Sequence, residues 1–119
     1  MEKVNLAQKG KLFEDVWSPK IVGELNGQHV KLVKIEGEFG WHHHEKEDEL
    51  FLVVEGEIEI HLRDKSVLLG PGEFLIVPKG VEHNPSSKKK SLVMLFEPHT
   101  TLNTGNVINE KTKQKLDEI

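Results

Sequence analysis

The chain has 119 residues, of which 30% are charged, and its formal net charge is -4. This length suits one compact domain with its own core, and the acidic balance offers no basic field for nucleic acid. The chain contains no cysteine, which excludes a disulfide framework and a thiolate metal site, and no tyrosine, which excludes a tyrosyl acid.

Targeting and membrane segments are not indicated by the hydropathy pattern. The first twenty residues hold no apolar stretch long enough for a signal sequence, and no later run approaches the length of a membrane span. We therefore expect a soluble, cytoplasmic protein that binds neither nucleic acid nor a membrane.

Short strands are predicted along most of the chain, beginning with a hairpin near residue 19. The dipeptide Asn26-Gly27 is a strong two-residue turn signal between two apolar runs, at residues 21–25 and 29–35. Further strands are predicted, with glycine or proline between most of them, at about 50–54, 57–62, 67–69, 74–77 and 92–96. Many short strands at this spacing predict an all-β sandwich or barrel.

Two of these strands are apolar on both faces. Residues 57–63 alternate cleanly between apolar and polar side chains, so only one face of that strand is expected to be buried. Residues 50–54 and 92–96 do not alternate, which a small barrel explains only if a second surface covers their outer sides. We therefore expect a homodimer.

The chain divides into a barrel and two terminal segments. Residues 1–18 are expected to pack on the barrel or on a partner, residues 19–105 to form the barrel, and residues 106–119 to form a helix or tail. In the last segment Ile108, Thr112, Leu116 and Ile119 fall at helical spacing, and Asn109 is a candidate N-cap. This pattern predicts a short C-terminal helix.

Three histidines and one glutamate form a candidate site for a divalent metal ion. His42 and His44 are two apart, so on an extended chain their side chains leave the same face, close enough to chelate one ion, and His43 points away. Residues 45–48 are all charged and indicate a turn, after which Glu49 can rejoin the histidines from the neighbouring strand.

The fourth residue, His83, follows a turn that is suited to aim it into a barrel. Proline at position 78 fixes φ, and glycine at position 80 supplies a backbone conformation that other residues resist. His42, His44, Glu49 and His83 are therefore the predicted metal ligands.

These residues fit two glycine-punctuated motifs, through which the chain resembles the small single-domain cupins. The first motif, H-x-H-x4-E-x6-G, is met at positions 42, 44, 49 and 56, and the second, G-x5-P-x-G-x2-H, at positions 72, 78, 80 and 83. Two positions depart from the usual pattern: Gly37 lies one residue closer to His42, and Ser87 replaces a frequent asparagine. The resemblance implies a jelly-roll barrel, also called a double-stranded β-helix, with a metal ion bound by the four residues.

A wider resemblance runs from about Trp17 to Gly105 and includes the sequences WSPK at 17–20 and TLNTG at 101–105. It is similar to an uncharacterised group often labelled mannose-6-phosphate isomerase-like from fold similarity alone. That label is an analogy, because a shared fold does not fix function.

Three functions are compatible with such a site. Imidazole and carboxylate ligands suit Fe, Mn, Ni, Co, Cu or Zn, and the order of affinities does not choose among them. The first function is a metal-dependent enzyme of the oxygenase or isomerase type acting on a small polar metabolite. The alternatives are a non-catalytic module or sensor that binds a small ligand, and a barrel stapled by a structural metal.

Few side chains outside the ligand set are indicated as parts of the site. Phe51 shares the strand face of Glu49 and is expected to line the cavity. The one arginine, Arg63, lies on the polar face of its strand, so a phosphate would have to be bound by lysines such as Lys31, Lys34 or Lys79, or by backbone amides.

Overall fold

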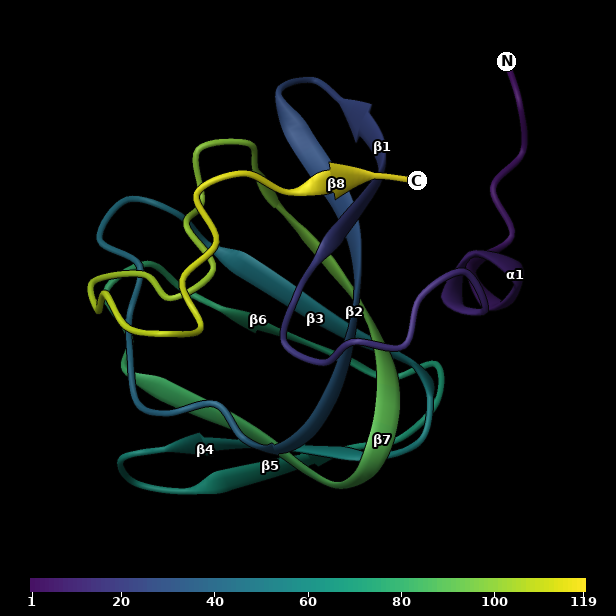
Figure 1. The fold of residues 1–119 in the computed structure, drawn as a ribbon. Helices are drawn as coiled ribbons and strands as arrows, with labels where there is room; N and C mark the ends of the chain where they lie inside the picture. Colours follow the sequence, from purple (N-terminus) through teal and green to yellow (C-terminus); the bar gives the residue numbers. More distant parts are fainter.

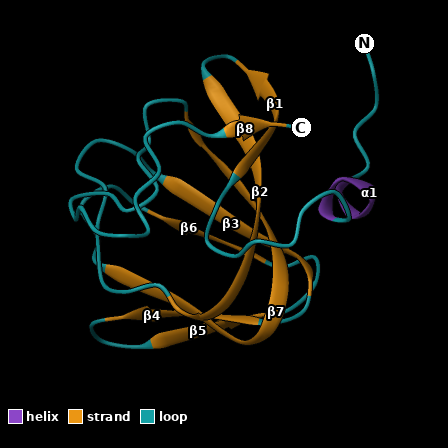
Figure 2. Cartoon of the chain, in the orientation of Figure 1, coloured by secondary structure: helices purple, strands orange, loops and turns teal.

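The computed structural model describes residues 1–119 as a barrel of eight strands and one short helix (Figures 1 and 2). The elements in chain order are α1 (Leu6–Gly10), β1 (Lys20–Leu25), β2 (Gln28–Glu38), β3 (Glu49–Glu55), β4 (Ile58–Leu62), β5 (Ser66–Leu69), β6 (Phe74–Val77), β7 (His83–Pro98) and β8 (Asp117–Glu118). The all-β prediction is confirmed, and Asn26-Gly27 forms the turn between β1 and β2, with both residues at positive φ. No helix of the protein is long and apolar enough to cross a membrane.

The long strand β7 joins the two layers of the barrel. Its first residues pair with β4, and its later residues pair with β3, while β2 runs antiparallel beside it along most of its length. The pairing of β2 with β7 shifts register between Ile35 and Gly37, and Gly37 has φ +77°. Such a bulge bends both strands, so β7 passes from the layer of β4 and β5 to the layer of β3 and β6 (Figure 1).

The core lies between these two layers. Ten buried apolar side chains form it, drawn from six strands: Val33, Ile35, Phe51, Val53, Ile58, Ile60, Leu69, Val77, Val93 and Leu95. They occupy alternate positions on their strands, as the period of two requires. The barrel therefore has an apolar core that is independent of any metal ion.

The N-terminal segment covers part of the outer face of the barrel. Phe13 is buried against Leu32 and Leu92, which point outward from β2 and β7, and Leu6 packs on the same cluster. The chain's own N-terminal segment thus buries part of the outer apolar surface that the sequence analysis assigned to a partner. Farther along this face Phe74 and Ile76 are more than half exposed, and the homodimer stays a prediction.

The predicted C-terminal helix is wrong. Residues 106–116 form turns and loops, and β8 then pairs in parallel with β1 (Figure 1). Asn109 accepts a hydrogen bond from the backbone of Lys111, two residues on, as an N-cap would, but the turn it closes does not continue into a helix. Asn103 bonds the backbone of both Lys111 and Lys113, so side-chain hydrogen bonds compete with the helical pattern and prevail.

Gly56 permits the close approach of β3 and β7. It has φ +94°, and a Cβ added there would collide with the side chain of Ser91. Ser91 is itself buried and hydrogen-bonded to the backbone of Glu57, so it has little room to move.

Replacement of Gly56 by alanine is expected to destabilise the barrel by about 2–5 kcal/mol, from backbone strain plus overpacking. Gly72 is the matched control, since it has φ +81° but nothing within 4 Å of an added Cβ. Gly72→Ala should cost only the strain, about 1–2 kcal/mol. Urea unfolding measures both values, and equal losses would contradict the steric argument.

Candidate metal centre

His42, His44, Glu49 and His83 lie together inside one end of the barrel. Each offers one ligand atom, and these atoms lie within 4.8 Å of one another. All four residues are buried, with exposed fractions of 5% or less. His42 and His44 come from the loop between β2 and β3. Glu49 begins β3, and His83 begins β7.

Backbone hydrogen bonds tie the two motifs to each other. The amide of His42 donates to the carbonyl of His83 at 3.1 Å, and the amide of His83 donates back to His42 at 2.9 Å. The amide of Gly80 donates to the carbonyl of His44 at 2.8 Å. The turn at residues 78–80 therefore fixes the position of His83 relative to both histidines of the first motif.

Two imidazole rings are oriented by backbone carbonyls. His42 Nδ1 lies 3.1 Å from the carbonyl oxygen of Gly40, and His83 Nδ1 lies 2.9 Å from that of Val81. A carbonyl only accepts hydrogen bonds, so each Nδ1 carries the proton, and in the neutral ring Nε2 is left with a free lone pair. Carbonyls that hold the outer nitrogen in this way are common partners of metal-ligating histidines.

The inward atoms of the cluster are acceptors without a donor. Oε1 of Glu49 lies 3.3 Å from Nε2 of both His44 and His83, and neither ring nitrogen of His44 has a hydrogen-bond partner. Buried acceptors that face one another repel unless a proton or cation lies between them. The donor set therefore fits a divalent metal ion.

Burial keeps His42 neutral at physiological pH. Burial, with the nearby His83 ring as a second cause, lowers the pKa of His42 from 6.5 to about 4. Burial alone raises the pKa of Glu49, but a donated proton or positive charge on the facing rings of His44 and His83 outweighs burial and lowers that pKa well below its ordinary value. Neutral imidazole and ionised carboxylate are the forms that bind metal ions.

A buried ion pair that the sequence analysis missed lies next to Glu49. Nζ of Lys31 donates to Oε1 of Glu97 at 2.9 Å, and both side chains are 2% exposed. Burial and the charge of Glu49 raise the pKa of Glu97 well above its ordinary value. Lys31 is therefore not a surface residue that could bind a phosphate. It lies on the inward face of β2, on alternate positions with Val33 and Ile35.

Asn84 and Gly105 also position the cluster. Asn84 is buried directly after His83, and its side chain accepts from the amide of Gly40 and donates to Glu38, both at 2.8 Å. Gly105 packs so tightly on the backbone of His43 that an added Cβ would collide with it. Neither was singled out as a positioning residue from the sequence, because both act through contacts distant along the chain.

The remaining polar residues around the motif have structural partners. His43 stays outside the cluster and contacts Glu45 at 2.6 Å. Asp48 accepts from the amide of Lys79 at 2.8 Å, and Glu47 accepts from Thr100 at 2.9 Å. The charged turn therefore clamps neighbouring loops. Its carboxylates do not line the cavity beside His42 and Glu49, but Glu45 and Glu47 line a second cavity together with His44.

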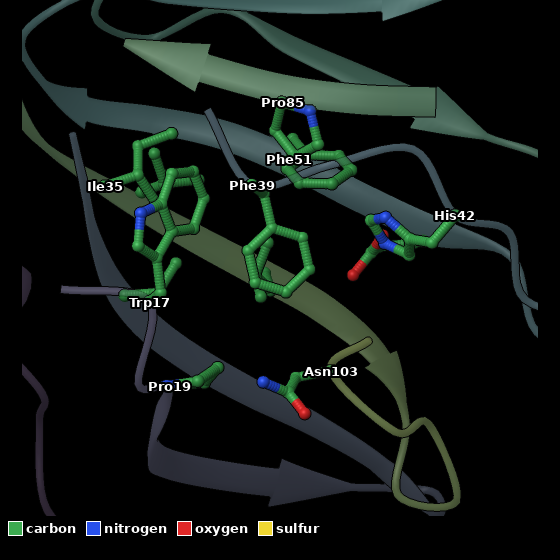
Figure 3. A pocket seen from close by; sticks show the side chains of 12 residues that line it. Trp17, Pro19, Ile35, Phe39, His42, Phe51, Pro85 and Asn103 are labelled. Carbon is green, nitrogen blue, oxygen red and sulfur yellow. The ribbon is translucent and has the colours of Figure 1, made fainter. Parts of the chain in front are cut away.

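The first cavity opens beside His42 and Glu49, and Phe51 is among the side chains that line it (Figure 3). The ring of Phe51 meets His83 edge-on, with centroids 5.9 Å apart. The other lining side chains shown in Figure 3 include Trp17, Phe39 and Asn103. Trp17 and Asn103 come from segments that flank the barrel motifs.

The family model described as "Cupin domain" matches residues 28–97, a range that includes all four residues of the cluster. The chain belongs to the cupin family. An uncharacterised protein of Bacillus subtilis (strain 168), YdbB, is 38% identical over 77 residues, which cover 64% of this chain and 68% of that protein.

Two solved structures show the same fold at substantial identity. A cupin-2 domain containing protein from Shewanella frigidimarina is 45% identical, with a TM-score of 0.79, over 81% of this chain and 94% of that one. Protein NMB1881 from Neisseria meningitidis is 34% identical, with a TM-score of 0.75, over 82% and 99% of the two chains. The first name gives the family, and neither name gives a reaction.

The lowered pKa of His42 makes the stability of the metal-free protein depend on pH. Between pH 4 and 6.5 the unfolded chain binds a proton at this ring that the folded state does not, so stability falls as the pH drops through this window. The shift of about 2.5 pKa units corresponds to about 3 kcal/mol.

His42→Gln is expected to flatten this part of the profile. Urea unfolding of chelator-treated protein at pH 7, 6 and 5 should show a steeper loss for the wild type than for the variant. Parallel losses in the two proteins would mean that His42 does not carry the shift.

Proposed function

We propose that the protein binds one divalent metal ion through His42, His44, Glu49 and His83 and catalyses a reaction of a small metabolite that contacts this ion. The observation that supports it is the convergence of buried acceptor atoms whose outer partners leave their lone pairs facing inward. Fe, Mn, Ni, Co, Cu and Zn all suit imidazole and carboxylate ligands.

A bound ion of this kind supplies Lewis acidity, lowers the pKa of a bound water, and orients a chelating substrate. The protein's own contribution is to hold the ligands. Gly40 and Val81 fix two ring tautomers through their carbonyls, and Glu49 offsets one of the two positive charges. Lys31 holds Glu97 in the interior, and the charge of Glu49 is near enough to raise the pKa of Glu97.

Between the two reaction types, the cavity favours an oxygenase over an isomerase. An isomerisation that moves a proton between two carbons requires a base beside the substrate. The ionisable side chains that line the cavity are His42 and Glu49, both of them proposed ligands. Glu45 and Glu47 of the charged turn line a separate cavity, with His44, and not this one.

The alternatives rest on separate observations. The cavity is lined by no ionisable side chain other than His42 and Glu49, which is also compatible with a module that binds a small ligand without converting it. A purely structural metal is less well supported, because ten apolar side chains already form a core without the cluster. A cytoplasmic location stays a prediction from the sequence.

His44→Ala is expected to lower bound metal well below one ion per chain while the barrel remains folded, since the core does not include His44. Element analysis of untagged protein, purified without chelator or nickel resin, gives the moles of each metal per chain. Circular dichroism and thermal unfolding report the fold.

His43→Ala is the matched control, because the neighbouring ring lies outside the cluster and should leave metal content unchanged. A His44→Ala protein that keeps one ion per chain would refute the proposed ligand set. Near-stoichiometric iron in the wild type would support oxygenase chemistry and select an oxygen-consumption screen.

A further inference from the structure

The outer face of one barrel layer is apolar across four neighbouring strands. Strand β3 pairs with β6 on one side and with β7 on the other, and β7 pairs with β2. Phe51, Val53 and Leu95 point into the core, so the residues between them point outward. The registers align the outward residues in two rows, and all eight are apolar: Ile76, Leu50, Phe96 and Val30 in one row, and Phe74, Leu52, Met94 and Leu32 in the other.

The chain itself covers only one end of this outer apolar face. Phe13 packs on Leu32, which is fully buried, and Met94 packs on the same cluster. At the other end, on β6, Phe74 is 57% exposed and Ile76 is 52% exposed. Strand β6 pairs with β3 alone, so it lies at the open edge of its layer (Figure 1). Apolar side chains that stay exposed together at a sheet edge indicate an interaction surface.

The charges that flank β6 fit a second copy of the same strand. Glu73 directly precedes β6, Lys79 follows two residues after its end, and both are exposed. Neither side chain forms an ion pair within its own chain. A two-fold axis that runs two β6 strands antiparallel brings Glu73 of each copy to the partner's Lys79. The outward rows hold no charge, so a strongly acidic or basic partner would find no counter-charge on them.

We propose that a second copy of this chain covers the open end of the outer apolar face, in a two-fold dimer with the two β6 strands antiparallel at its centre. Phe74 and Ile76 of both copies lose their contact with water there. The N-terminal segment covers the other end of the face, so it stays clear of this interface. The dimer does not depend on the proposed metal ion, because none of its central residues belongs to the cluster.

Sedimentation equilibrium of untagged protein, over a wide range of concentration, measures the dissociation constant of the dimer. Ile76→Asp is expected to raise this constant by about a hundredfold or more, since the lost apolar contact and the buried charge each occur twice in a two-fold interface. Leu68→Asp is the matched control, because Leu68 is 59% exposed but lies on β5, in the other layer. It should leave the dissociation constant unchanged, and circular dichroism reports whether both variants keep the fold.

A charge swap tests the pairing of the two copies. Lys79→Glu faces the partner's Glu73 with a like charge and is expected to raise the dissociation constant by up to about tenfold. The double variant Glu73→Lys, Lys79→Glu restores opposite charges across the interface, so its affinity should return close to that of the wild type. Because both positions are exposed, these variants test the interface even if Ile76→Asp does not fold.

The contrary results are distinct. A wild type that stays monomeric at every concentration would overturn the second copy as the occupant, and binding of phosphatidylcholine vesicles in its place would assign the face to a membrane. A dimer that survives Ile76→Asp unchanged, or a charge swap that binds no better than Lys79→Glu alone, would refute an interface centred on β6. Since a chelator should leave the dimer intact, failure of the proposed metal function leaves this inference standing.

Discussion

The two hydrogen bonds between the backbones of His42 and His83 are the constraint on which the site depends. They join a loop that follows β2 to the first residue of β7, so two motifs far apart in the sequence present their side chains to one point. The bond from Gly80 to His44 adds a third connection. With the backbones fixed in this way, carbonyl partners have only to choose the tautomers of His42 and His83. The four side chains are thus already gathered at one point, and the proposed ion would require little further ordering of them.

The interior near Glu49 also contains a buried polar pair, Lys31 and Glu97. Lys31 and Glu97 are buried on inward positions of β2 and β7, where a core of this size would otherwise hold apolar residues. Their pairing satisfies most of their polar atoms, although one oxygen of Glu97 lacks a partner. Such a pair is weak evidence for stability. The pair instead places a buried lysine and a second carboxyl group in the interior near Glu49.

The sequence predicted what depends on local chemistry. The turn at Asn26-Gly27 and the alternation in β4 are signals within a few residues, and the structure has a hairpin and a half-buried strand there. The spacing of His42, His44, Glu49 and His83 brought together four residues that the structure places within one cluster.

What the sequence did not predict depends on distant contacts. The tail after Gly105 has helical spacing, but Asn103 bonds it from outside the segment. Phe13 covers the outer face of the barrel near Leu92. From the pattern of the strands alone, this cover could be assigned only to a second subunit. The positive φ of Trp17 follows from its hydrogen bonds to β2, which no local pattern encodes.

Trp17 and Asn103 lie outside the part of the chain that the family model matches, residues 28–97, whereas all four residues of the cluster lie inside it. Part of the cavity wall thus comes from stretches of the polypeptide outside the one that supplies the cluster. Substitutions in these flanks can reshape the cavity without changing any of the four clustered residues. Membership of the family, which rests on residues 28–97, therefore does not describe this part of the wall.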